Sequence, residues 1–202
     1  MSGAGSTEAR LEALTAVELA AARGELPSWS RITPKRREHM ARVAALLEEW
    51  AGTLRLPEVE VLRWAAAGWL HDALRDEEPG RLVHDVTSEE RDLPGPTLHG
   101  PAAAARLQGA VHPRVQNAVR YHTIGHPGLD RLGRALYLAD FLEPGRPFSV
   151  EWRASLRDRM PQEIDPVLLE VLASRLQHLI EQRKPIRPET AAFWSGVVEE
   201  RQ

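Results

Sequence analysis

The chain has 202 residues, a length that favours one domain with a sizeable hydrophobic core. Its 26 basic and 29 acidic residues leave a net charge of -3, which argues against a stable nucleic-acid partner. Because cysteine is absent, disulfides, thiolate metal sites and thiol nucleophiles are excluded, and any metal must be held by nitrogen and oxygen ligands. Neither a signal peptide nor a membrane-spanning stretch is predicted, so we expect a cytoplasmic protein with no membrane partner.

The first part of the chain predicts helices separated by proline and glycine. Residues 8–23 are rich in alanine and leucine, and the residues that follow have the composition of a connector, so we assign 1–33 to an N-terminal helical extension and 34–202 to the main domain. Thr33 is the expected N-cap of a helix that starts at Pro34 and ends near Gly52. A second helix is expected to follow Pro57 and to end near Asp76.

The rest of the chain continues the helical pattern. Residues 77–98 are rich in proline, glycine and charge, which predicts a long loop broken by a helical turn. Further helices are expected over residues 101–109, 113–122, 129–142, 165–183 and 188–199. No sustained alternation of apolar and polar residues predicts a strand, and the fold class is therefore all-α.

Histidines and aspartates fall on the apolar faces of several of these helices. A single inward histidine is more often a hydrogen-bonded core residue than a ligand. Six such groups on five segments change that expectation, because buried imidazoles and carboxylates with few buried cations nearby are most simply satisfied by metal ions. Asp72 is the natural candidate to bridge two metals held roughly 3.5 to 4 Å apart, an arrangement suited to displacement at phosphorus. The six residues are His39, His71, Asp72, His99, His122 and Asp140.

The order of these residues resembles a known family. The matching text is RREH at 36–39, GWLHDALR at 68–75, LHGPAAAA at 98–105, the run from VRYHTIG to LYLADFLEPGR at 119–146, and RKPIRPET near the end. The chain is similar to the HD-domain metal phosphohydrolases and, more narrowly, to their YqeK-like branch of symmetrical bis(5'-nucleosyl)-tetraphosphatases. A second HD pair, His84 and Asp85, lies in the long loop and is assigned only a solvated surface role.

The resemblance implies an HD-domain helical bundle with a two-metal centre. His39, His71, Asp72 and Asp140 would bind one divalent ion, and His99 and His122 would bind the second with Asp72 as the bridge. Iron is the expected metal, with manganese or another divalent ion as the alternative. The implied reaction is cleavage of diadenosine tetraphosphate into two ADP by a metal-bound hydroxide.

Further residues acquire roles from the same resemblance. Arg75 follows Asp72 by three residues, where the family usually has lysine, and arginine keeps the positive charge in a planar, bidentate form. Asp72 and Arg75 are therefore the expected catalytic residues. Arg75, Thr123 and Arg146 are expected to bind the substrate, and an ordinary structural role for Thr123 and Arg146 is the alternative.

Two other functions remain open from the sequence. One is an HD-domain phosphohydrolase that acts on another nucleotide, because the metals determine the chemistry whereas the pocket determines the substrate. The other is a non-catalytic sensor module that binds metal or nucleotide. A homodimer is also left open.

Overall fold

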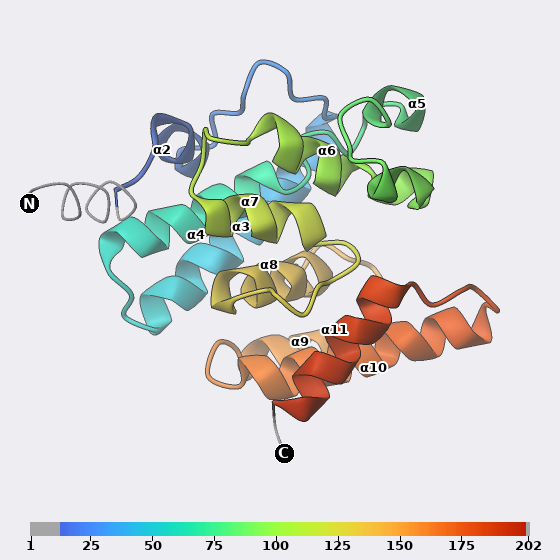
Figure 1. Cartoon of the computed structure of the whole chain (residues 1–202). Helices are drawn as coiled ribbons and strands as arrows, with labels where there is room; N and C mark the ends of the chain where they lie inside the picture. Colours follow the sequence, from blue (N-terminus) through green and yellow to red (C-terminus); the bar gives the residue numbers. More distant parts are fainter. Residues whose placement is uncertain (1–12, 201–202) are drawn as a thin grey trace, which may run out of the picture.

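The computed structural model describes residues 13–200, and every regular element in that range is helical (Figure 1). This confirms the all-α prediction. The α-helices are α2 (Ala16–Ala22), α3 (Pro34–Thr53), α4 (Glu58–Leu70), α5 (Pro79–Leu82), α6 (His99–Arg106), α7 (Pro113–Tyr121), α8 (Arg131–Leu142), α9 (Val150–Asp158), α10 (Ile164–Glu181) and α11 (Pro188–Glu199). Two 3₁₀ turns, η1 (Glu89–Asp92) and η2 (Gly95–Thr97), lie in the predicted long loop.

Side-chain caps begin α3 and α8, and the cap of α3 is the one that the sequence predicts. The hydroxyl of Thr33 accepts a hydrogen bond from the backbone N–H of Arg36, and Pro34 is the first residue of α3. Asp130 caps α8 in the same way through the N–H of Gly133. These caps satisfy backbone donors that have no partner within the helix.

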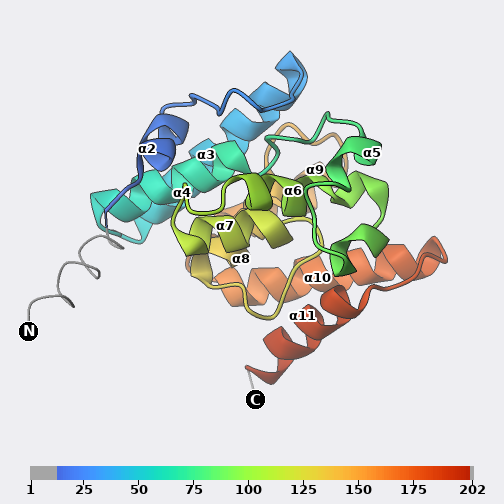
Figure 2. The same cartoon turned by 45° about the horizontal axis from the view of Figure 1, so that its top comes forward.

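Helices α3, α4, α7 and α8 form the centre of the molecule (Figures 1 and 2). Trp50, Trp64 and Leu136 lie in their shared core and are almost completely buried. Helices α3 and α4 approach each other closely at Gly68, where an added Cβ atom would lie 2.6 Å from the Cα of Ala44. Because residue 68 is a glycine, the C-terminal end of α4 packs closely against α3. This packing brings His71, which follows α4, near His39 of α3.

Helix α4 ends earlier than the sequence predicts. Its last residue is Leu70, and residues 71–76 form a series of tight turns instead of a helical continuation to Asp76. The ring of His71 donates from Nδ1 to the carbonyl oxygen of Gly68 at 2.7 Å, and the backbone then turns through bonds such as Arg75 N–H to Asp72 O at 2.9 Å. A side chain that hydrogen-bonds to a carbonyl oxygen of the helix competes with the backbone N–H groups for that oxygen, which explains why α4 ends at Leu70.

Two other helices differ from the expectations. Of the helix expected over 8–23, residues 8–12 lie outside the described range, and within that range the helix covers Ala16–Ala22, where Thr15 and Glu18 form a capping box. Helix α9 was not predicted, because the prolines and glycine before it indicate a loop. The spacing of Trp152 and Leu156 by one helical turn is the signal that could have revealed it.

Helix α2, the first helix of the described residues, lies against α4 (Figure 2). The carboxylate of Glu18 is fully buried, accepts the N–H of His112 at 3.0 Å and lies 3.5 Å from the guanidinium of Arg63. These contacts connect α2 to both α4 and the start of α7. Within residues 13–200, no helix combines the length and the apolar character needed to cross a membrane.

Candidate metal centre

The six side chains expected to bind metal come together between the central helices. His39 lies on α3, His71 and Asp72 follow α4, His99 begins α6, His122 follows α7, and Asp140 lies on α8. All are buried except Asp140, whose side chain is 19% exposed. Five segments that are distant in sequence therefore contribute to one site.

The histidine rings are held by their Nδ1 atoms. Carbonyl oxygens accept from Nδ1 of three of them at 2.7 to 2.9 Å: Gly68 from His71, Pro96 from His99, and Val119 from His122. The fourth, His39, lies 3.1 Å from Glu143 Oε1. Because these oxygens can only accept, each Nδ1 carries a proton, and in the neutral tautomer each Nε2 presents a lone pair. Metal-binding histidines are oriented in the same way.

One group of ligand atoms surrounds His39 and His71. The Nε2 atom of His39 lies 3.1 Å from Asp140 Oδ1, and that of His71 lies 4.0 Å from the same oxygen. Both Nε2 atoms are buried and make no hydrogen bond to any other residue between 13 and 200. Buried acceptors without donors are unfavourable, and a cation among them would satisfy all three side chains.

The second group surrounds His99 and His122. Their Nε2 atoms face each other at 3.1 Å, although both rings carry their proton on Nδ1. Two lone pairs at this distance repel each other unless a positive centre lies near both. Asp72 Oδ1 lies 3.0 Å from His99 Nε2 and 3.5 Å from His122 Nε2. The donor set of two imidazoles and a carboxylate fits a divalent ion.

Asp72 connects the two groups. Its Oδ1 faces His99 and His122, whereas its Oδ2 lies 3.6 Å from His39 Nε2 and 3.5 Å from His71 Nε2. Ligand atoms of His39, His71 and Asp140 lie within 4.8 Å of one another, and so do those of His71, Asp72 and His122. A carboxylate with one oxygen toward each cluster has the geometry of a bridging ligand.

Two arginines contact the carboxylates of Asp72 and Asp140. The sequence predicts few cations near these side chains, and this prediction is wrong. Arg36 Nη1 donates to Asp72 Oδ2 at 2.8 Å, and Arg146 Nη2 donates to Asp140. Burial alone would raise the pKa of Asp72, but the electrostatic interaction with His71 and the close imidazole of His122 hold it well below its ordinary value. The pKa of Asp140 is likewise lowered, by His39 and Arg146, against the effect of burial.

The sequence interpretation missed Glu143, which is buried beside His39. It receives hydrogen bonds from Arg42 Nε at 2.6 Å and from the N–H of Gly145 at 2.7 Å. Burial would raise its pKa, but contacts with His39 and Arg42 lower it to about 2. Glu143 thus stays charged and fixes the ring of His39. Its position three residues after Asp140, on the same face of the chain, was the available signal.

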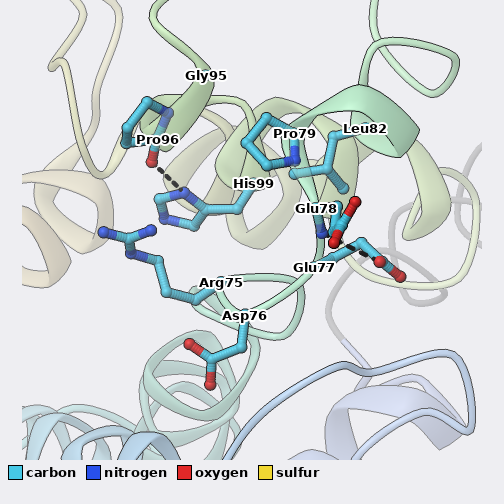
Figure 3. A pocket seen from close by; sticks show the side chains of 9 residues that line it. All are labelled: Arg75, Asp76, Glu77, Glu78, Pro79, Leu82, Gly95, Pro96 and His99. Atoms are coloured by element: carbon cyan, nitrogen blue, oxygen red, sulfur yellow. Dashed lines mark hydrogen bonds between the residues drawn. The ribbon is translucent and has the colours of Figure 1, made fainter.

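The residues expected to bind substrate lie around this centre. The hydroxyl of Thr123 is 3.1 Å from His122 Nε2, and Arg146 bonds to Asp140 as described. Arg75 lies beyond the end of α4 and lines a pocket that includes His99 (Figure 3). The second HD pair is not among the clustered side chains: Asp85 pairs with Arg106 at 2.6 Å, which agrees with a surface role.

Comparison with known proteins identifies three relatives that are named symmetrical bis(5'-nucleosyl)-tetraphosphatases. The protein of Halalkalibacterium halodurans is 29% identical over 105 residues, 50% of this chain and 54% of the relative. The protein of Bacillus subtilis is 28% identical over 104 residues, with the same coverage, and that of Staphylococcus aureus is 29% identical over 127 residues, 57% of this chain and 62% of the relative. The chain spans about half the length of the first two relatives and somewhat more of the third.

A solved structure shares the fold. It is described as a predicted HD superfamily hydrolase involved in NAD metabolism from Clostridium acetobutylicum, and it superposes with a TM-score of 0.72 at 23% identity. The match covers 84% of this chain and 92% of that structure. The family model of the HD domain matches residues 36–145, which is more than half of the chain and includes all six clustered side chains. The chain therefore belongs to the HD domain family.

Proposed function

We propose that this protein is a metal-dependent phosphohydrolase that cleaves diadenosine tetraphosphate symmetrically into two ADP. The observation that carries the proposal is Asp72, whose two carboxylate oxygens face two separate groups of imidazoles. The names of the relatives support the choice of substrate.

The proposed metal ligands are the six clustered residues. His39, His71, Asp72 and Asp140 would hold one divalent ion, and His99, His122 and Asp72 would hold the second. A pair of divalent ions in such a site supplies Lewis-acid activation of water and offsets negative charge on the phosphoryl oxygens. Iron is the metal we propose, and manganese is the alternative that the same ligands accept.

The surrounding side chains have distinct tasks in this proposal. Glu143 and the three backbone carbonyls orient the imidazoles, which is the role that outer partners have in metal sites. Arg75 lies next to His99 and supplies positive charge for the phosphate chain, and Arg146 does so beside Asp140. Thr123, next to His122, offers a hydroxyl to a phosphate oxygen.

The test is product analysis with diadenosine tetraphosphate. The protein is prepared without oxygen, supplied with ferrous iron or with manganese, and compared with the His71→Ala variant. ADP as the sole initial product, and its absence with the variant, are expected. The exposed residue Glu48 offers a matched control, because Glu48→Ala changes α3 away from the site.

Other products would point elsewhere. ATP together with AMP would keep the hydrolase and reject symmetrical cleavage. Turnover of other nucleotides only would favour a different HD phosphohydrolase, and binding of metal and nucleotide without any turnover would favour a sensor module.

A further inference from the structure

A pocket of about 390 Å³ adjoins the metal centre on the His99 side (Figure 3). It is formed by the turns after α4, by α5 and by η2, so the segment predicted as a long loop supplies one of its walls. Its volume lies in the range of pockets that bind small molecules. Because His99 belongs both to the pocket and to the second group of ligand atoms, a molecule in the pocket reaches the site of chemistry.

Two of the charged side chains in the pocket are occupied by structural contacts. Asp76 Oδ2 accepts the backbone N–H of Thr33 at 2.7 Å. Glu77 accepts the N–H of Glu78 at 3.0 Å and lies within 4 Å of Arg31 and Arg81. These carboxylates hold the turn in place and are not free to bind a ligand.

The other two charged side chains have no such contacts. Within residues 13–200, the guanidinium of Arg75 and the carboxylate of Glu78 make no hydrogen bond or ion pair. Glu78 precedes α5, but its side chain does not cap that helix. In Figure 3, Arg75 extends toward His99 on one side of the pocket, whereas Glu78 lies with Leu82 on the opposite side.

This distribution selects for one class of ligand. A cation beside the metal centre attracts a phosphate, and a carboxylate at the other side accepts hydrogen bonds but repels further phosphates. Pro79, Leu82 and Pro96 add apolar surface to the lining. A ribonucleoside 5'-phosphate fits this distribution, because it carries a phosphate at one end and hydroxyl donors beside a ring at the other.

We propose that this pocket binds the nucleoside half of the substrate that leaves on the His99 side, with Glu78 accepting the ribose hydroxyls. Arg75 contacts the phosphate at the inner end, and the base packs against the proline and leucine side chains. Glu78 is then a specificity-determining residue that distinguishes ribonucleotides from analogues without these hydroxyls. This inference rests on the proposed function for the identity of the whole substrate, although its test uses only the product half.

The experiment measures binding by calorimetry to the manganese-loaded protein. The probes are ADP, 2',3'-dideoxy-ADP and inorganic diphosphate. ADP is expected to bind about tenfold more tightly than the dideoxy analogue, the size of about one hydrogen bond to a charged acceptor. In Glu78→Ala this difference disappears, while diphosphate binds as before. In Glu48→Ala the difference between ADP and its dideoxy analogue remains, and in Arg75→Gln the binding of all three probes is weaker.

Two results would overturn the inference. Equal binding of ADP and its dideoxy analogue to the unaltered protein would mean that no carboxylate accepts hydrogen bonds from the ribose hydroxyls. A difference that persists in Glu78→Ala would place that recognition elsewhere. The proposed function fails separately: if diadenosine tetraphosphate is not cleaved but the preference for ADP depends on Glu78, the pocket assignment stands.

Discussion

The guanidinium of Arg36 donates to Asp72 Oδ2 at 2.8 Å, the same oxygen that faces His39 and His71. Arg36 is one helical turn before His39 on α3, so the two side chains reach the centre from one face. The arginine thereby balances the charge of a carboxylate that is 5% exposed. This ion pair connects α3 to the turn after α4.

We expect Arg36→Gln to destabilise the metal-free protein by about 2 kcal/mol, since it leaves the buried carboxylate of Asp72 without its charged donor. Metal ions supply the missing positive charge, so the loss should be smaller in the metal-loaded protein. Thermal unfolding with and without manganese measures both values. Lys35→Gln, at an exposed neighbour, is the control. An equal loss in both states would contradict the argument.

The two oxygens of Asp72 predict unequal losses of metal among variants. Asp72→Ala removes a ligand from both groups, whereas His99→Ala removes one from the second group only. Metal analysis after dialysis should therefore find both ions weakened in Asp72→Ala and one retained in His99→Ala. Identical metal contents in the two variants would show that Asp72 does not bridge.

Glu143 predicts a dependence of stability on pH. Its pKa is about 2 instead of 4.5, so its contribution is fully present above pH 4.5 and is lost as the pH falls through about 2. A shift of this size corresponds to roughly 3 kcal/mol. Metal-free Glu143→Gln should thus be less stable than the unaltered protein at pH 7, with a difference that shrinks toward pH 2.

Urea unfolding at several pH values between 7 and 2 measures this difference. The pKa values of Asp72 and Asp140 are also lowered, but they contribute to both proteins and cancel to first order. The exposed Glu151 provides the control substitution Glu151→Gln. A difference that stays constant with pH would contradict the assigned role of the Glu143 carboxylate.

A substitution at Gly68 tests the close approach of α3 and α4. A Cβ atom there would lie 2.6 Å from Ala44 Cα and 2.8 Å from Ala44 N, and backbone atoms cannot move aside cheaply. Gly68→Ala should lower the free energy of unfolding by about 1–3 kcal/mol or more. Gly52→Ala, also in a helix but with no atom within 4 Å, should instead be neutral or stabilising. Denaturant unfolding measures the free energy of unfolding of both variants, and equal values for the two would contradict the close approach of α3 and α4 at Gly68.

Much of the molecule follows from local patterns in the sequence. Caps and prolines determine where helices such as α3 and α8 begin, because they act within one turn of the chain. The positions of His39 and Asp140 on apolar faces likewise indicate that they point inward, since helical periodicity alone decides the face. The all-α fold and the six clustered side chains could therefore be predicted.

Other features depend on residues that are distant in sequence, and only the tertiary structure determines them. The ring of His71 ends α4 early because it is buried against Gly68, and this turn places Arg75 and Glu78 in one pocket. The contacts of Arg36 with Asp72, and of Glu143 with His39, join α3 to segments 36 and 104 residues away. Such contacts arise from packing, because no local propensity specifies which charged side chains will meet once the helices assemble.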